Sequence, residues 1–565
     1  MKKIILMLAV SCSFCFLSII SNAQTPNWLW AKTAGGSSND IAYSVAVDAS
    51  GNSFVTGWFG SPDLTFAPTT LTNNGADDIF LTKYDASGNV VWARSAGGTN
   101  HDYANSVAVD PSGNSYIVGS FTSDTIIFGS YTLINTDNTT NSTSDLFLVK
   151  YNSSGNVLWA KSAAGLNNDE AASVSVDASG NVYLTGYFSS YTLSFGTITL
   201  TNTDTINYTD DIFIAKYNSS GNVVWAKSYG GTGWDDACSI AVDASGNTYV
   251  AGAYDSPTIV FGTSTLTNSS SVDTTDIFIT KFDASGNALW AKSAAGRGDD
   301  VAYTVALDAS ENSYVAGWFQ SPSIKFGSTT LLNNDATGAS NDLFIAKYNT
   351  SGNLQWVKRA GGDGNDQASS ISVTTSGNFF LAGQFSSPSI IFGSDTLSNT
   401  GSTYYLDAFA TKYDASGNVL WATSVGGTSD DQAYSVATDV SGNAYLAGCY
   451  YSPTIKFGAT TLTNFDNTSN TADIFIAKLG SNSGINDFVN SSDILIYPNP
   501  ADYNLTVKTP QSSEIEILNI DGQLLQIITS NENYTTINIS GLARGMYFVK
   551  IKTEKGIEMG KFVKE

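Results

Sequence analysis

The chain contains 565 residues, of which 42% are hydrophobic and only 13% are charged, and its formal net charge is −24. A surface this acidic repels nucleic acid and anionic membranes, so neither is expected as a partner. Gly, Ser, Thr, Asn and aromatic residues are abundant, a mixture typical of many short strands joined by polar turns. We therefore expect an all-β protein.

The first 23 residues differ from the rest of the chain. Lys2 and Lys3 precede an apolar run that ends at Ile20, and small residues lead to Ala23. This layout predicts a secretory signal peptide over residues 1–23. No later apolar run is long enough to cross a bilayer, so we expect no transmembrane segment once the signal is removed.

A repeat fills residues 24–480, and we interpret these residues as one domain. Each copy reads approximately W-A-K-S-x-G-G, D-x-A-x-S-V-A-V-D-A-S-G-N-x-Y-V-x-G, I-x-F-G-x-x-T-L-T-N and D-I-F-I-A-K-Y-D-A-S-G-N-V-V. Seven tryptophans, spaced 62 to 67 residues apart, mark its period: Trp30, Trp92, Trp159, Trp225, Trp290, Trp356 and Trp421.

Each repeat contains two hairpins, which are residues 44–57 and 78–94 in the first copy. Their D-A-S-G-N turns occur thirteen times in the chain, with small changes. The Asp side chain can accept backbone N–H bonds, and the Gly takes the left-handed conformation. Glu311 replaces the Gly once and should strain its turn. Asn replaces the Asp three times, which favours turn geometry over metal binding, at Asn152, Asn218 and Asn349.

Four antiparallel strands in each repeat leave two edge strands without a partner. Placing the repeats around a common axis protects these edges. The first strand should be innermost, because its alternate positions are small, as at Ala46 and Ala108. The chain begins with a lone fourth strand, 27–32, and its last repeat ends with a lone third strand, 473–479. Seven repeats with two hairpin turns each would have fourteen turns. If these two strands pair, they close the ring without a connecting turn, which explains why only thirteen occur. We therefore expect a closed seven-bladed β-propeller.

The repeat motifs over residues 27–479 resemble the SBBP (seven-bladed β-propeller) repeat, and the first two strands also resemble the NHL propeller repeat. The resemblance implies a propeller fold and an extracellular location. It does not imply one activity, because propellers have many functions.

The chain changes character after residue 480. Residues 481–491 form a small-residue linker, and residues 492–565 contain short alternating strands separated by turns. This pattern predicts a small Ig-like β-sandwich.

The motifs of this tail resemble the C-terminal sorting domain of the bacterial type IX secretion pathway. They are the opening Tyr497-Pro498-Asn499-Pro500, the segment with Gly541 and Gly545, and the basic end with Lys561. The resemblance implies recognition by the type IX machinery, export through the outer membrane, and release or surface attachment. A plain Ig-like accessory module is the alternative.

Catalytic groups are scarce. His101 is the only histidine, and most other repeats carry Asn or Asp at its position. His and Cys residues cannot form a metal cluster, and the two glutamates of the repeat region, Glu170 and Glu311, are far apart in sequence. We therefore expect no enzyme and no bound cofactor, although a polysaccharide-degrading enzyme with two aspartates stays an alternative.

Two aspartates recur in every repeat, and both should lie on one face near the axis. They could lock neighbouring blades by accepting backbone N–H bonds, or bind a ligand or a cation such as calcium. The first-strand aspartates, our candidate ligand-binding residues, are Asp40, Asp102, Asp169, Asp235, Asp300, Asp366 and Asp431. The third-strand aspartates are Asp78, Asp145, Asp211, Asp276, Asp342, Asp407 and Asp473.

A specific site should break the sevenfold repetition. The segments between the second and third strands vary most, and aromatic residues in variable loops suit recognition of a glycan or a protein. Plain solvated connections are the alternative. The candidate ligand-binding residues in loops are Trp234, Tyr208, Tyr404, Tyr405 and Phe465.

Seven lysines recur in the third strands, where we expect them to offset nearby turn carboxylates: Lys83, Lys150, Lys216, Lys281, Lys347, Lys412 and Lys478. Cys238 and Cys449 occupy different positions within their repeats, so two free, partly buried thiols are expected rather than a disulfide.

Taken together, these features predict a monomeric, secreted or surface-attached binding module for a glycan or a protein. A passive adhesive scaffold without a defined ligand is the main alternative.

Overall fold

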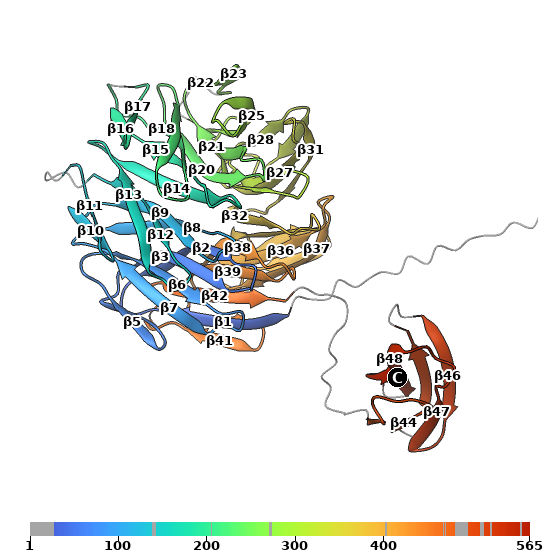
Figure 1. Ribbon diagram of the computed structural model, residues 1–565. Helices are drawn as coiled ribbons and strands as arrows, with labels where there is room; N and C mark the ends of the chain where they lie inside the picture. Colours follow the sequence, from blue (N-terminus) through green and yellow to red (C-terminus); the bar gives the residue numbers. More distant parts are fainter. Residues whose placement is uncertain are drawn as a thin grey trace, which may run out of the picture. The chain divides into compact units, whose positions relative to one another are not determined.

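The chain folds into two compact units, one ending at Ser481 and the other starting at Asn482. The computed structural model (Figure 1) describes residues 27–137, 143–204, 206–269, 274–401, 404–466, 468, 470–480, 495–508, 513–519, 523–553 and 556–565. These residues form strands and turns but no helix, so none of them belongs to a helix able to cross a membrane. The predicted signal peptide and linker lie outside the described residues.

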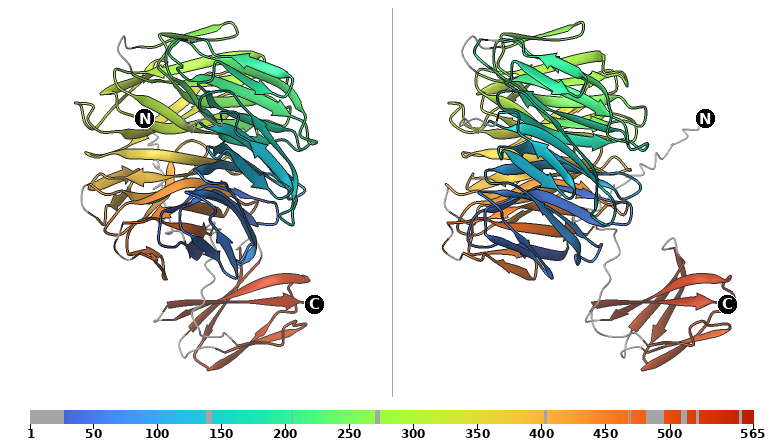
Figure 2. Two further views of the ribbon diagram at one scale, coloured as in Figure 1. Left: turned by 90° about the vertical axis from the view of Figure 1, so that its left-hand side faces the viewer. Right: turned by 60° about the vertical axis from the view of Figure 1, so that its left-hand side comes forward.

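The first unit contains seven antiparallel sheets, each built from four main strands, and a neighbouring hairpin extends one of them to six strands. These sheets confirm the predicted all-β propeller architecture (Figures 1 and 2). Their first strands are β2 (Asp40–Val47), β8 (Asp102–Val109), β14 (Asp169–Val176), β20 (Asp235–Val242), β26 (Asp300–Leu307), β32 (Asp366–Val373) and β38 (Asp431–Thr438). Their second strands are β3 (Ser53–Phe59), β9 (Ser115–Phe121), β15 (Val182–Phe188), β21 (Thr248–Tyr254), β27 (Ser313–Phe319), β33 (Phe379–Phe385) and β39 (Ala444–Tyr450).

The third strands are almost entirely buried, and the fourth strands form the outer edges. The third strands are β6 (Asp78–Tyr84), β12 (Asp145–Tyr151), β18 (Asp211–Tyr217), β24 (Asp276–Phe282), β30 (Asp342–Tyr348), β36 (Asp407–Tyr413) and β42 (Asp473–Leu479). The fourth strands are β7 (Val90–Ala96), β13 (Val157–Ala163), β19 (Val223–Tyr229), β25 (Ala288–Ala295), β31 (Leu354–Ala360), β37 (Val419–Val425) and β1 (Trp28–Ala34).

The first strand of the chain completes the last sheet. β1 pairs with β42, and Trp30 lies opposite Lys478. The innermost strands also form a closed belt: the backbone N–H of Val45 donates to Ser435 Oγ at 3.1 Å, and each of the other six first strands makes the equivalent bond to a Ser or Thr of its neighbour. The predicted pairing of 27–32 with 473–479 is therefore present.

The recurring tryptophans join neighbouring sheets. Trp30 Nε1 donates to the carbonyl of Ala86, in the turn before β7, at 3.2 Å. A Cβ on Gly88 of that turn would lie 2.8 Å from the Trp30 ring, and its φ is +80°. The turn glycine is thus required both for the left-handed backbone and for the close approach of the indole.

Our prediction of four strands per repeat was incomplete, because an extra hairpin lies between the second and third strands. Its apolar residues, such as Leu64 and Phe66, are buried, and Phe66 packs on Phe80 of β6 with ring centroids 5.3 Å apart. The hairpins are β4 (Asp63–Phe66) with β5 (Thr69–Thr72), β10 (Thr125–Phe128) with β11 (Tyr131–Ile134), β16 (Thr192–Phe195) with β17 (Ile198–Thr201), β22 (Thr258–Phe261) with β23 (Ser264–Thr267), β28 (Ser323–Phe326) with β29 (Thr329–Leu332), β34 (Ser389–Phe392) with β35 (Asp395–Ser398), and β40 (Thr454–Phe457) with β41 (Thr460–Thr463).

The second unit consists of a three-stranded sheet, β43-β44-β47, and a four-stranded sheet, β46-β45-β48-β49, which share one apolar core. Its predicted Ig-like topology stays a prediction. The strands are β43 (Ile496–Tyr497), β44 (Asn504–Lys508), β45 (Ser513–Leu518), β46 (Leu524–Ser530), β47 (Tyr534–Asn538), β48 (Gly545–Thr553) and β49 (Gly556–Lys564).

The predicted sorting motifs come together within this unit. Asn499, between Pro498 and Pro500, accepts the backbone N–H of Val563 at 2.9 Å and donates to the carbonyl of Lys561 at 3.2 Å. Tyr497 ends β43, while Gly541 lies in the turn before β48, which Gly545 begins. The opening motif is therefore held against the last strand of the chain.

Candidate ligand-binding cavity

The first-strand aspartates are structural in their geometry. All seven are fully buried, and each carboxylate accepts a hydrogen bond of 2.7 to 2.9 Å from a serine hydroxyl that follows the second strand of its own sheet. Burial raises the pKa of Asp40 to about 7, despite the hydrogen bonds from Ser61. These bonds fix the aspartates within their own sheets, so the locking of neighbouring blades stays a prediction. None of the seven lines the cavity described below.

The third-strand aspartates anchor the loops that precede them. Each accepts a backbone N–H from the loop after the extra hairpin, as Asp473 does from Phe465 at 2.7 Å. Within the described ranges, no group of three His, Cys, Asp or Glu side chains could hold a metal ion. In this geometry these aspartates hold the loops that precede them, and their binding of a ligand or a cation stays a prediction.

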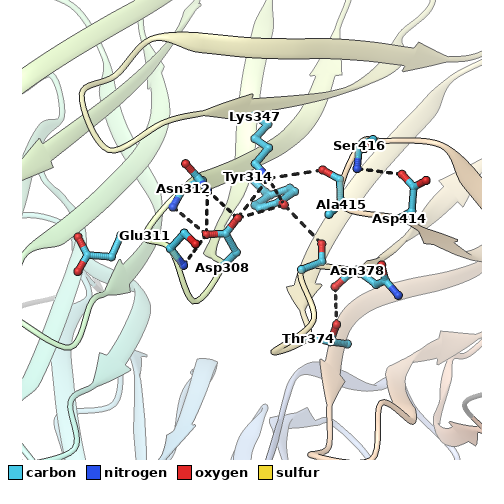
Figure 3. Close-up of polar contacts among 12 residues, drawn as sticks. Asp308, Glu311, Asn312, Tyr314, Lys347, Thr374, Asn378, Asp414, Ala415 and Ser416 are labelled. Atoms are coloured by element: carbon cyan, nitrogen blue, oxygen red, sulfur yellow. Dashed lines mark hydrogen bonds and ion pairs between the residues drawn. The ribbon is translucent and has the colours of Figure 1, made fainter.

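The recurring lysines face the turn carboxylates, as Figure 3 shows for one of them. Lys347 Nζ lies 3.2 Å from Asp308 and 4.5 Å from the centroid of the Tyr314 ring. Four other lysines pair with the same turn position: Lys83, Lys150, Lys281 and Lys478. The remaining two, Lys216 and Lys412, form no ion pair among the described residues; in the sheet of Lys412, Thr374 replaces the turn aspartate.

A β-bulge interrupts every first strand and redirects one side chain. In β2 the register shifts between Ala42 and Ser44, which leaves Tyr43 without a partner on β3. A bulge of this kind bends the strand and re-aims the extra residue. The equivalent residues in all seven sheets line one cavity: Tyr43, Asn105, Ala172, Cys238, Tyr303, Ser369 and Tyr434.

This cavity lies where the seven first strands face one another and has a volume of about 710 Å³. Residues directly after the first-strand aspartates, together with side chains from β3, β15 and β33, complete its wall. These further lining residues are Trp58, Tyr103, Glu170, Tyr187, Asp236, Ala237, Gln367 and Gln384.

One part of the wall is acidic. Glu170 accepts hydrogen bonds of 2.9 Å from Asn105 and from the Tyr187 hydroxyl, and burial raises its pKa. Burial and the nearby Glu170 raise the pKa of Asp236 to about 6. Asp210, which precedes β18, is 7% exposed, and burial together with Asp236 and Glu170 raises its pKa to about 8.

Another part of the wall is aromatic. Tyr43 and Tyr434 form an edge-to-face pair with centroids 5.2 Å apart, and Trp58 and Tyr103 form a second at 5.4 Å. The Tyr103 hydroxyl donates to Asp77, whose carboxylate also lies 2.5 Å from His101 Nδ1. The only histidine of the chain therefore lies beside the aspartate that accepts the hydrogen bond of a cavity tyrosine.

The predicted loop residues do not reach this cavity. Trp234, Tyr208, Tyr404, Tyr405 and Phe465 are all exposed and lie in loops of four different sheets. Their role in binding stays a prediction. The structure does not bring them together at the cavity.

Cys238 and Cys449 are free thiols, as predicted. Cys238 lines the cavity, and burial raises its pKa to about 12, so the thiol stays protonated and unreactive at neutral pH. Cys449 is completely buried in β39 rather than partly buried, because it packs between neighbouring sheets with Ile41 and Ala472.

Sequence reasoning missed the cavity, although its signal was present in the repeat. The pattern D-x-A-x-S-V contains two positions at which the seven copies differ, and these positions supply eleven of the cavity residues. Nothing in one copy of the pattern shows that a bulge turns the second position toward the axis.

Comparison with known protein families identifies both parts of the chain. Residues 495–565 match the secretion system C-terminal sorting domain. This is a type IX export signal. The protein is therefore exported to the cell surface or the extracellular space. Residues 91–124 match the β-propeller repeat, in agreement with the sheets seen in the structure.

Two curated proteins share sequence with the chain. A WD repeat-containing protein of Acanthamoeba polyphaga mimivirus is 26% identical over 521 residues, covering 76% of this chain and 36% of the relative. The regulatory protein FlaEY of Caulobacter vibrioides is 31% identical over 170 residues, covering 29% of this chain and 17% of that protein. The chain thus spans well under half the length of both relatives.

Solved structures show only distant likeness. PorZ, a surface component of the type IX secretion system of Porphyromonas gingivalis, has a TM-score of 0.23 at 12% identity, over 93% of this chain and 81% of its own. The Pan2 WD40 domain of Neurospora crassa has a TM-score of 0.37 at 8% identity, and the match covers 80% of this chain and 97% of that chain. Likeness at this level carries no functional information.

Proposed function

We propose that the protein is an exported, non-catalytic binding module that holds a glycan in its central cavity. The observation that carries this proposal is the convergence of the divergent positions of all seven repeats on one cavity. A feature needed for the fold recurs in each repeat, whereas a binding site needs different groups at different places. Export delivers this cavity to the cell surface or the medium, and we propose that the protein acts there as a monomer.

The size and lining of the cavity favour a glycan over a protein face. A volume of about 710 Å³ lies within the range of pockets for small ligands or terminal groups. Protein interfaces are instead broad, with about 800 Å² buried on each partner. Tyrosine and tryptophan rings can pack on the apolar faces of a sugar, while the carboxylates and the amides of Gln367 and Gln384 can bond its hydroxyl groups.

A glycan array probed with the full chain tests this proposal. A saturable ligand should bind the wild type and should not bind Ala172→Trp, because the new indole fills the cavity. The matched variant Ala172→Ser keeps the cavity open and should bind normally.

Three results would contradict it. Binding that survives Ala172→Trp would place the site elsewhere, with the variable loops as the next candidates. Absence of any saturable ligand would favour the passive scaffold. Release of shortened oligosaccharides would indicate the degrading enzyme.

A further inference from the structure

Asp236, in the acidic part of the cavity wall, lacks the serine hydroxyl donor that each first-strand aspartate has. Six of the third-strand aspartates also have one buried oxygen without a partner, but each accepts a backbone N–H through its other oxygen. Asp235 accepts bonds from the Ser256 hydroxyl and from backbone N–H groups. The neighbouring Asp236 has a buried Oδ1 without any hydrogen-bond partner. Asp210 is buried, and the side-chain hydrogen bonds of the described residues do not include its carboxylate.

No basic side chain offsets these acids. The cavity wall contains no Lys or Arg, and the ion pairs of the described residues do not include Glu170, Asp210 or Asp236. The recurring lysines pair with the turn aspartates at the other ends of the first strands, as Lys281 does with Asp243. A buried carboxylate without a basic partner either takes up a proton or binds a cation from outside the fold.

Building on the proposed function, we infer that the cavity selects an amino sugar and binds its protonated amine between Glu170 and Asp236. A charged N–H donor satisfies the buried Oδ1 of Asp236 and offsets the charge that it shares with Glu170 and Asp210. The aromatic wall adds the attraction of ring faces for a cation.

The other lining groups favour an amino sugar over a lysine-bearing peptide. Asn105, Gln367 and Gln384 offer amide donors and acceptors, and the tyrosine hydroxyls add more. A lysine side chain ends in one ammonium on an apolar stem and carries no acceptor, so it cannot accept a hydrogen bond from the amide or hydroxyl groups of the wall. A sugar ring surrounds its amine with hydroxyl groups that can bond them.

Titration calorimetry with two oligomers of equal length tests this inference. One probe is a β-1,4-linked glucosamine tetramer, and the other is its fully N-acetylated counterpart, which lacks the charge. We would work at pH 6.5, below the pKa of about 7.7 to 8.0 expected for an amine flanked by electron-withdrawing groups. The full chain should bind the amine form at least ten-fold more tightly.

Variants separate specific binding from general attraction to an acidic protein. Asp236→Asn and Glu170→Gln should each lower the affinity for the amine form at least ten-fold without changing that for the acetylated form. The control Asp63→Asn removes the same charge from an exposed site in β4 and should leave both affinities unchanged. Thermal midpoints of all variants verify that they are folded.

Each other outcome overturns the inference. Equal affinity for the two oligomers, lost in Ala172→Trp, would keep the glycan site but refute the role of charge. Equal losses in Asp236→Asn and Asp63→Asn would show non-specific attraction. Tighter binding of a lysine peptide in the cavity would assign the acids to a different ligand class, and failure of both oligomers to bind would refute amino-sugar recognition.

Discussion

Two neighbouring residues of β20 show the two kinds of position in this propeller. Asp235 recurs in every repeat, is fully buried, and bonds to Ser256. Asp236 has a different residue type at most equivalent positions, faces the cavity, and has an unpaired buried oxygen. Positions that recur in all seven repeats thus maintain the fold, whereas the proposed binding groups lie at positions where the repeats differ.

Removing the repeated aspartate should have the largest effect on stability. Asp235→Ala is expected to lower the free energy of unfolding by about 2–4 kcal/mol, because the Ser256 hydroxyl and two backbone N–H groups lose a buried acceptor. Asp236→Ala removes a buried carboxylate oxygen that has no partner, so it should not lower this free energy. Urea unfolding followed by tryptophan fluorescence measures both. Equal losses in the two variants would remove the distinction between the positions.

The buried aspartates also predict how stability depends on pH. Burial raises the pKa of Asp40, Asp366 and Asp431 to about 7, above the value of 3.8 for the unfolded chain. The folded state therefore binds protons that the unfolded state has released, so stability falls as pH rises from about 4 to 7 and then levels off. The thermal midpoint should be several degrees higher at pH 5 than at pH 8. A thermal midpoint that rises with pH over this range would contradict the raised pKa values of these aspartates in the folded state.

A smaller gain is expected where one repeat departs from the turn pattern. Glu311 has a φ of +61°, a conformation that only glycine adopts without strain. Glu311→Gly should raise the free energy of unfolding by about 1 kcal/mol, after the loss of a weak ion pair with Lys281. Glu311→Ala loses the same pair but keeps the strain, so it should not stabilise the fold. A gain in both variants would assign the effect to charge.

The smallest effect is expected at the turn that lacks its aspartate. Thr374→Asp should stabilise the fold by about 0.5 to 1 kcal/mol, because the new carboxylate can accept the turn N–H groups and face Lys412. Thr374→Asn supplies the acceptor without the charge, as the chain itself does at Asn152. A difference between the two variants in thermal unfolding measures the contribution of the lysine.

Much of the fold follows from local patterns. Alternation, the D-A-S-G-N turns and the unpaired first and last strands predict the sheets and the pairing of β1 with β42. The extra hairpins were missed because four-residue strands such as β4 are too short to show alternation. The cavity could not be predicted, because the bulge at Tyr43 depends on packing of the first strands around the axis. Which variable residues then face one another is decided by contacts between distant repeats.

A crystal structure of the full chain with the tightest glycan found on the array tests the central claim most directly. The account predicts density for the ligand in the cavity, in contact with Tyr103 and Asp236. Density confined to the loops around Tyr208, Tyr404 or Phe465, with the cavity free of ligand, would contradict it and make the variable loops the binding site.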